Sequence, residues 1–329
     1  MVDAVLIENL VAPGRTLSVG RMGRSDARFR WLTGTAALAV LLIFVGVAVS
    51  LIAGALPAIQ AFGWAFLWTQ KWNPVTEKFG ALAAIYGTLV TSTLAMLLAV
   101  PVGIGIAIFL TELCPRPLRR PIGIAIELLA GIPSIIYGIW GLFVFAPIFQ
   151  RTFQPWLIDL FTNVPIFKTV FAGPPYGIGV LTASLILSVM VLPFIAAVTR
   201  DVFETMPPTV KEAGYATGCT TWEVLWHIVL PFARAGVVGG AMLALGRALG
   251  ETMAVTFVIG NANRIASSVF APGTTISAQI ANEFTEAVGD LYLSSLIELG
   301  LILFFVTFIV LAAAQLMLRQ LERRAGAVS

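Results

Sequence analysis

Residues 211–231 read KEAGYATGCTTWEVLWHIVLP, a polar segment that lies between two strongly apolar stretches of the chain. A proline pair at 207–208 precedes it, and proline suits the first positions of a helix. Gly218 suits the left-handed residue that often ends a helix. Together these residues predict a short helix over residues 208–217.

This predicted helix has the composition of a docking element. A docking helix needs small residues where a partner's backbone comes close, and Ala213, Gly214 and Gly218 meet that need. It also needs a charge that fixes the register, and Glu212 meets that one. On the pattern alone, an amphipathic helix that lies at the membrane interface without a partner is an equal interpretation.

A second helix is expected directly after the first. Thr220 and Glu223 have the spacing of a capping box, in which each residue satisfies a backbone N–H group at the start of a helix. Pro231 is expected to end this second helix before the next apolar stretch.

The composition of the whole chain is that of an integral membrane protein. Of its 329 residues, 58% are hydrophobic and only 11% are charged, and the mean hydropathy is +0.93. A soluble domain carries about a quarter charged residues. A membrane-spanning helix needs about 20 apolar residues. Six stretches qualify, so we expect an all-α protein with six transmembrane helices at 32–56, 81–110, 122–149, 177–198, 235–259 and 293–316.

Prolines within these stretches predict departures from straight helices. Pro101, Pro133, Pro147 and Pro193 are expected to kink or end helix locally. The first stretch could alternatively be a secretory signal, but it is longer than the 7–15 apolar residues of a typical signal core. We therefore expect it to stay as an anchor.

Basic residues predict the orientation of the chain. If alternate loops share a side, fourteen of the twenty Lys and Arg residues fall on the side that holds both termini and residues 200–234. Five fall on the opposite side, and Arg247 lies within a stretch. Both termini and the segment with Glu212 are therefore predicted to be cytoplasmic.

The polar segment also resembles the signature of type I ABC importer permeases. The residues that carry the resemblance are Glu212, Ala213, Gly214, Gly218 and, after nine intervening residues, Ile228, Leu230 and Pro231. The departure is Gly214, where the family usually has a second alanine. Further stretches are similar to the permease subunits of phosphate-specific ABC importers: YGTLVTS (86–92), FLTEL (109–113), IPS (132–134), YGIWGL (137–142), GCTTWEV (218–224) and GRALGETMAVT (246–256).

The resemblance implies a division of the chain and a set of partners. It implies a basic cytoplasmic tail over 1–30, a six-helix permease domain over 31–318 with a coupling loop at 200–234, and a cytoplasmic tail over 319–329. It implies a second homologous permease, two ATPase subunits and a periplasmic phosphate-binding protein. Phosphate and the lipid bilayer complete the set, with no nucleic acid, and the chain would lie in the bacterial inner membrane.

Arg247 and Glu251 are the candidates for the translocation pathway. They are four residues apart, so one helix is expected to carry both on the same face. An arginine near the middle of a membrane costs about 2.5–3.5 kcal/mol unless it faces a partner or an aqueous cavity. A guanidinium can hold two phosphate oxygens at once. The alternative is a structural pair that stabilises the helix or bridges subunits.

Small residues on the same stretch predict close helix packing. Gly236 and Gly240, and again Gly246 and Gly250, have a four-residue spacing. We expect this helix to lie against the second permease.

Enzyme chemistry is not expected in this chain. No Gly-x-x-x-x-Gly-Lys-Ser/Thr sequence occurs, so ATP and magnesium are expected on the separate ATPase subunits. His227 with Cys114 and Cys219 does not make a usual zinc site, and the two cysteines are not expected to form a disulfide. Two alternatives to phosphate import stay open: a permease for another oxyanion such as sulfate or molybdate, and a gradient-driven transporter or channel.

Overall fold

The computed structural model describes residues 19–326, and side chains within 26–320 apart from Ile166. The parts of the predicted tails at 1–18 and 327–329 lie outside the described residues. The described part is helical, with one isolated antiparallel bridge between Asn73 and Lys78. Six helical segments are long and apolar enough to cross a membrane: Asp26–Phe62, Leu82–Leu113, Ser134–Phe161, Val180–Glu204, Thr221–Leu249 and Asp290–Gln320. The predicted all-α fold with six spans is confirmed.

The chain divides into two compact units, residues 1–50 and 51–329. Helix α2 (Val19–Phe62) begins in the first unit, where nearly every described side chain is exposed, including Trp31, Leu42 and Ile43. Bare apolar side chains along a helix of this length need lipid or another protein around them.

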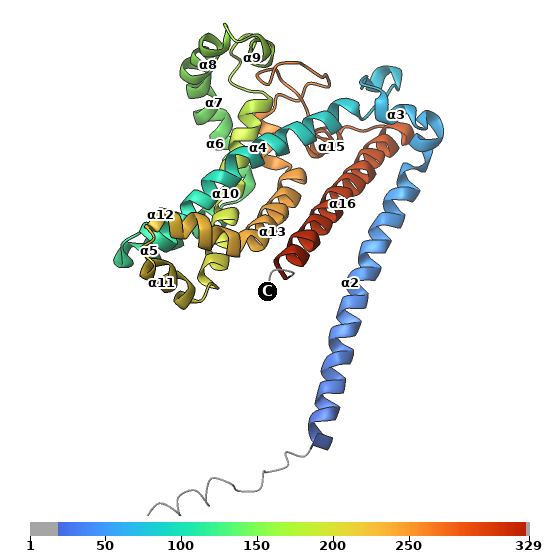
Figure 1. Ribbon diagram of the computed structural model, residues 1–329. Coiled ribbons are helices and arrows are strands. Elements are labelled where there is room, and N and C mark those ends of the chain that lie inside the picture. The colour runs from blue at the N-terminus through green and yellow to red at the C-terminus, as the bar shows by residue number, and fades with distance from the viewer. Residues whose placement is uncertain (1–18, 327–329) are drawn as a thin grey trace, which may run out of the picture. The chain divides into compact units, whose positions relative to one another are not determined.

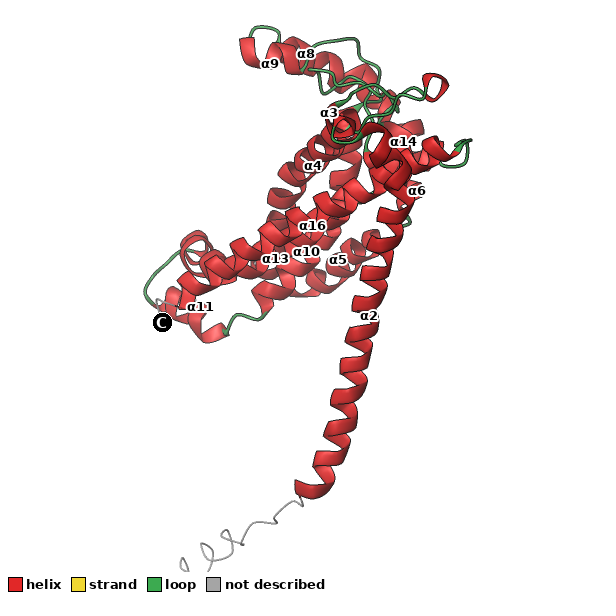
Figure 2. Ribbon diagram, turned by 90° about the vertical axis from the view of Figure 1, so that its right-hand side faces the viewer, coloured by secondary structure: helices red, strands yellow, loops and turns green. Residues whose placement is uncertain are grey.

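In the second unit, α4 (Leu82–Ile108) and α10 (Val180–Glu204) form the central pair. Gly103 lets them approach, since a side chain there would start 2.7 Å from Ile195. Helix α13 (Leu230–Leu249) packs against α10, and α16 (Asp290–Gly326) packs against the other side of α13, as Figure 1 shows. Figure 2 shows the same helices from the side. The largest apolar cluster is built around α4, α10, α13 and α14 and contains Leu187 of α10.

The apolar stretch predicted at 122–149 is not one helix. Helix α5 (Arg116–Ala130) ends before Pro133, and a second run then extends to Phe161. This run comprises α6 (Ser134–Trp140), η3 (Gly141–Phe145), α7 (Ala146–Ile148), η4 (Phe149–Phe153) and α8 (Gln154–Phe161). Pro133 thus ends helix as predicted, whereas Pro147 does not, because the π-helical turn η3 before it relocates the carbonyls that its ring would meet.

The fifth stretch also differs from the prediction at both ends. The capping box is confirmed, since the Thr220 side chain accepts from the Glu223 backbone and the Glu223 carboxylate accepts from the Thr220 backbone. Pro231 does not end the helix: α12 (Thr221–Val224) and the π turn η5 (Leu225–Val229) lead directly into α13. At the other end, α13 stops at Leu249 and a separate helix, α14 (Met253–Val258), follows.

Two ends of the second unit can be distinguished. Figure 1 shows α5, α11 (Pro208–Ala216) and α12 at one end, with α8, α9 (Pro165–Val170) and α15 (Ile276–Glu283) towards the other. Two short elements, α3 (Ala65–Trp68) and η1 (Pro74–Thr76), come after α2 in the chain. At the end with α15, the non-helical residues 259–275 are held by backbone hydrogen bonds to the start of α10, such as Leu181 N–H to the Val269 carbonyl at 2.8 Å.

Candidate functional site: the α11 loop and the end of α13

The short helix predicted over residues 208–217 is present as α11. Pro207 is its N-cap and Pro208 its first residue, so the missing proline N–H costs no helical hydrogen bond. The chain turns after the helix at Gly218, whose φ of +86° favours glycine. A Cβ at Gly218 would meet nothing within 4 Å, so this glycine serves the turn and not a close contact.

The small residues of α11 do not all face outward. Glu212 and Ala213 are exposed, whereas Gly214 is buried. A Cβ on Gly214 would lie 2.5 Å from Ile228 Cδ1 and 3.2 Å from Val224 Cγ2. Gly214 therefore does not face outward as expected, because it packs within the chain, whereas Gly218 is exposed at the turn and its contact with a partner stays a prediction.

The later residues of the signature lie behind α11. Ile228 and Leu230 are partly buried against an apolar cluster, and Pro231 is exposed. This cluster, called here the coupling cluster, consists of Ala107, Phe203, Met206, Val224, Leu225, Val229, Ala233 and Val237. It joins α4, α10 and α13 at the end where α11 lies, and Gly214 of α11 packs against Val224 of the cluster and Ile228 beside it.

An ion pair ties α11 to the second span. Lys211 Nζ lies 2.5 Å from Glu112 Oε1, in the π turn η2 (Phe109–Leu113) that follows α4. The two side chains are 21% and 9% exposed, so water screens the pair weakly. Sequence reasoning missed this contact, because no spacing rule links residues 99 positions apart.

Arg247 lies in the last turn of α13, where its side chain is exposed. It forms no ion pair with any residue that the structure describes. The prediction that Glu251 shares its helix face is wrong, because Gly250 caps α13 and Glu251 follows in the break. There Glu251 Oε1 accepts a 3.4 Å hydrogen bond from the Ala254 N–H and helps to begin α14.

The four glycines of α13 have different surroundings. A Cβ on Gly236 would lie 2.6 Å from Val202, and one on Gly240 would lie 2.7 Å from Val198, both on α10. A Cβ on Gly246 would lie 3.2 Å from Leu311 on α16. Gly250 is exposed, and a Cβ there would lie 3.9 Å from the Gly246 carbonyl oxygen of the same helix. Three of the four therefore bring α13 close to helices of the same chain.

Two carboxylates, one on α5 and one in the sixth span, have contrasting partners. Glu127 is paired with Arg200 of α10 at 2.8 Å. Glu298 on α16 is 6% exposed, and its Oε2 atom has no hydrogen-bond partner in the described part of the chain. No group of three or more His, Cys, Asp or Glu that could hold a metal ion lies within the described residues, and both cysteines are free.

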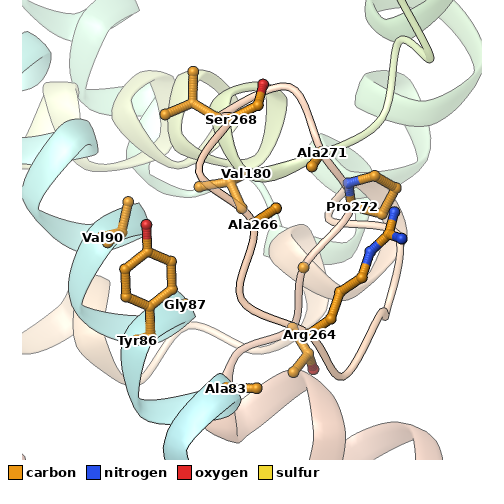
Figure 3. Close-up of a pocket in the computed structure, with 13 residues that line it drawn as sticks. Ala83, Tyr86, Gly87, Val90, Val180, Arg264, Ala266, Ser268, Ala271 and Pro272 are labelled. Atoms are coloured by element: carbon orange, nitrogen blue, oxygen red, sulfur yellow. The ribbon is translucent and has the colours of Figure 1, made fainter. Parts of the chain in front are cut away.

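A small cavity lies beside the end of α4, between Tyr86 and the 259–275 segment. Figure 3 shows Arg264 extending beside Pro272 and away from Tyr86. The cavity measures about 10 Å³, which is at the limit for a single water molecule. An ion as large as phosphate does not fit there in this conformation.

Comparison with known proteins places this architecture in a family. Residues 99–326 match the family described as binding-protein-dependent transport system inner membrane component. A phosphate transport system permease protein PstC of Mesorhizobium japonicum is 63% identical over 96% of this chain and 97% of its own. The PstC of Pasteurella multocida is 55% identical over 91% and 93%.

Solved structures support the same fold. A bacterial ABC transporter involved in the import of alginate aligns with a TM-score of 0.59 and 17% identity, over 90% of this chain and 98% of that one. The MetNI methionine ABC transporter aligns with a TM-score of 0.52 over 72% and 94%. With its six spans and the α11 loop between the fourth and fifth, the chain belongs to the binding-protein-dependent inner membrane transport components, in the PstC permease family.

Proposed function

We propose that this chain is a pore subunit of an ATP-driven importer that carries inorganic phosphate across the bacterial inner membrane. The observation that carries the proposal is the 63% identity, over nearly the whole chain, to a protein named as a phosphate transport system permease. The chain contributes no catalytic site; its relatives are permeases, and ATP and magnesium belong to partner ATPase subunits.

Coupling to the ATPases is assigned to α11. Glu212 and Ala213 are the residues of the signature on α11 that are exposed and free to meet a partner. Behind them, Gly214 and Ile228 pack closely, and Lys211 is paired with Glu112. A helix fixed in this way moves as one body with the spans, which is what a coupling element requires.

Arg247 is assigned to the translocation pathway. Its side chain is exposed near the end of the fifth candidate span and has no ion-pair partner in the part of the chain described. If that end lies in the membrane, the charge needs a counter-ion from outside this chain. Either phosphate in transit or an acidic side chain of a second permease would supply this counter-ion. Glu251, in the break directly after α13, is assigned to the same pathway.

The complete importer would contain a second homologous permease, two ATPases and a periplasmic phosphate-binding protein. With both termini and α11 in the cytoplasm, the end with α15 and residues 259–275 would face the binding protein. ATP-driven closure of the ATPases would move the α11 helices and open the pore outward. Hydrolysis would then return it to the inward-facing state.

Two measurements test this proposal against its alternatives. Recovery of an ATPase with the affinity-purified full chain would exclude a gradient-driven transporter or channel. Uptake of labelled phosphate that excess phosphate blocks, but sulfate and molybdate do not, would identify the substrate. Uptake that is blocked by sulfate or molybdate would indicate that the substrate is another oxyanion, while the importer architecture would still hold.

A further inference from the structure

A basic cavity of about 320 Å³ lies between α5 and the α11 end of α10. Four arginines line it, namely Arg116, Arg119, Arg120 and Arg200, together with Glu127 and Glu204. It is separate from α11 and from Arg247, and the transport scheme above makes no use of it.

The two carboxylates of the cavity are already engaged by one arginine. Arg200 lies 2.8 Å from Glu127 and 3.7 Å from Glu204, and it also pairs with Asp201 at 3.1 Å. Arg200 is therefore held by acidic groups of its own chain. The other three arginines keep their positive charge without neutralisation from these groups.

The remaining arginines present free donors. Arg119 donates from Nη2 to the Thr111 carbonyl at 2.6 Å, but its buried Nε atom has no partner in the described structure. Arg116 and Arg120 are exposed and form no ion pair with any described residue. Because guanidinium groups do not lose their protons, these arginines keep charges and donors that are available to an anionic ligand.

The backbone of α5 is shaped to bring Arg200 into this cavity. Gly123 is buried, and a Cβ there would lie 3.0 Å from Arg200 Nη1. Positions 116, 120, 123 and 127 recur at helical spacing, so the arginines, this glycine and Glu127 lie along one face of α5. These residues therefore form one continuous helix face, in contrast to charges scattered over a surface.

Apolar side chains on the same helix indicate the surroundings of the cavity. Ile124 lines the cavity and is 47% exposed, while Leu118 and Leu128 are 51% and 68% exposed. A helix with exposed apolar side chains beside a basic cluster has the character of an element at the boundary between headgroups and acyl chains. Arginines on the cytoplasmic side of such a boundary attract anionic lipids.

We propose that this cavity binds a phosphate group at the cytoplasmic face of the membrane. Two sources supply that group: the headgroup of an anionic phospholipid, and inorganic phosphate that leaves the transport pathway. Only the second source rests on the proposed transport function. A guanidinium pair such as Arg116 and Arg120 suits the oxygens of either one.

The test uses the purified full chain in detergent, titrated with phosphatidylglycerol or phosphatidylcholine of equal acyl length and followed by native mass spectrometry. The variant Arg116→Gln/Arg120→Gln removes two unpaired charges and breaks no ion pair within the chain. Arg234→Gln/Arg319→Gln is the matched control, since both residues are exposed and lie outside the cavity.

Wild type and control are expected to bind phosphatidylglycerol at least about tenfold more tightly than the Arg116/Arg120 variant, at about 1 kcal/mol per arginine. Phosphatidylcholine is expected to show no such difference. Displacement of phosphatidylglycerol by millimolar inorganic phosphate, but not by chloride of equal ionic strength, would assign the site to the ion. Equal phosphatidylglycerol affinity for wild type and the cavity variant, with no displacement by phosphate, would overturn the proposal and leave the arginines as orientation signals.

Discussion

Lys211 on α11 and Glu112 at the end of the second span form an ion pair with a 2.5 Å separation, although they are 99 residues apart in the chain. This pair and the coupling cluster connect α11 to α4 by two independent kinds of contact. The ion pair therefore holds α11 against the end of the span that packs on α10 in the centre of the fold.

Removing either partner of this pair is expected to weaken coupling. Glu112→Gln and Lys211→Met should each lower stability by about 1.5–3 kcal/mol, the range for a hydrogen bond to a charged group. The charge-swapped double variant Glu112→Lys/Lys211→Glu should recover part of the loss. Thermal unfolding in detergent and uptake per transporter measure both effects. Additive losses with no recovery in the swap would show that the two side chains do not act together.

Reversing the charge of Glu212 is expected to separate ATP hydrolysis from transport. Glu212 is exposed on α11, so Glu212→Arg should leave folding unchanged and disturb only the contact with a partner. Phosphate uptake should fall, while ATPase activity of the assembled complex persists. Normal uptake by a normally assembled Glu212→Arg complex would remove this residue from the coupling contact.

The stability of the fold is expected to depend on the size of the side chain at position 214. Alanine at Gly214 would press on the flexible end of Ile228, and its better helix propensity offsets part of that cost. Gly214→Ala should therefore change stability by less than about 1 kcal/mol, whereas Gly214→Leu should cost about 1–3 kcal/mol by overpacking. Unfolding temperatures of the two variants would measure this, and equal temperatures would contradict the packing described.

Neighbouring glycines on α13 provide a matched pair. Alanine at Gly240 would start 2.7 Å from Val198, a stiff β-branched side chain, whereas alanine at Gly239 would come no closer than 3.8 Å to Leu318. Gly240→Ala is expected to lower stability by about 1–3 kcal/mol, and Gly239→Ala to leave it unchanged or raise it. The opposite order in thermal unfolding would mean that α13 does not pack on α10 in this way.

Neutralising Arg247 is expected to reduce phosphate uptake at least about tenfold, because a charge-assisted hydrogen bond contributes about 1.5–3 kcal/mol. Arg247→Lys should keep part of the activity, since lysine retains the charge but not the planar fork of donors. Arg234→Gln, an exposed position on the same helix, is the control. Unchanged uptake in Arg247→Gln would favour the structural interpretation of this residue.

Most of the architecture could be predicted from local sequence. Apolar length identified the six spans, and turn and capping residues identified α11 and the capping box at Thr220. These features depend on residues within a few positions of one another, where spacing determines geometry.

The errors arose where nonlocal structure decides the outcome. Hydropathy did not show that α13 stops at Leu249, because the break is only three residues long (250–252) and apolar residues flank it on both sides. Pro231 was expected to end a helix, but the π turn before it accommodates its ring. The partners of Gly214 and Lys211 lie on other elements, and no sequence period reveals such contacts.

The most direct test of the central claim is phosphate accumulation by the complete complex in proteoliposomes, with the loaded binding protein outside and ATP with magnesium inside. Labelled phosphate is expected to accumulate against a gradient, to require both ATP and this chain, and to be insensitive to sulfate. Accumulation that is independent of ATP, or no accumulation by a complex that binds and hydrolyses ATP normally, would contradict it.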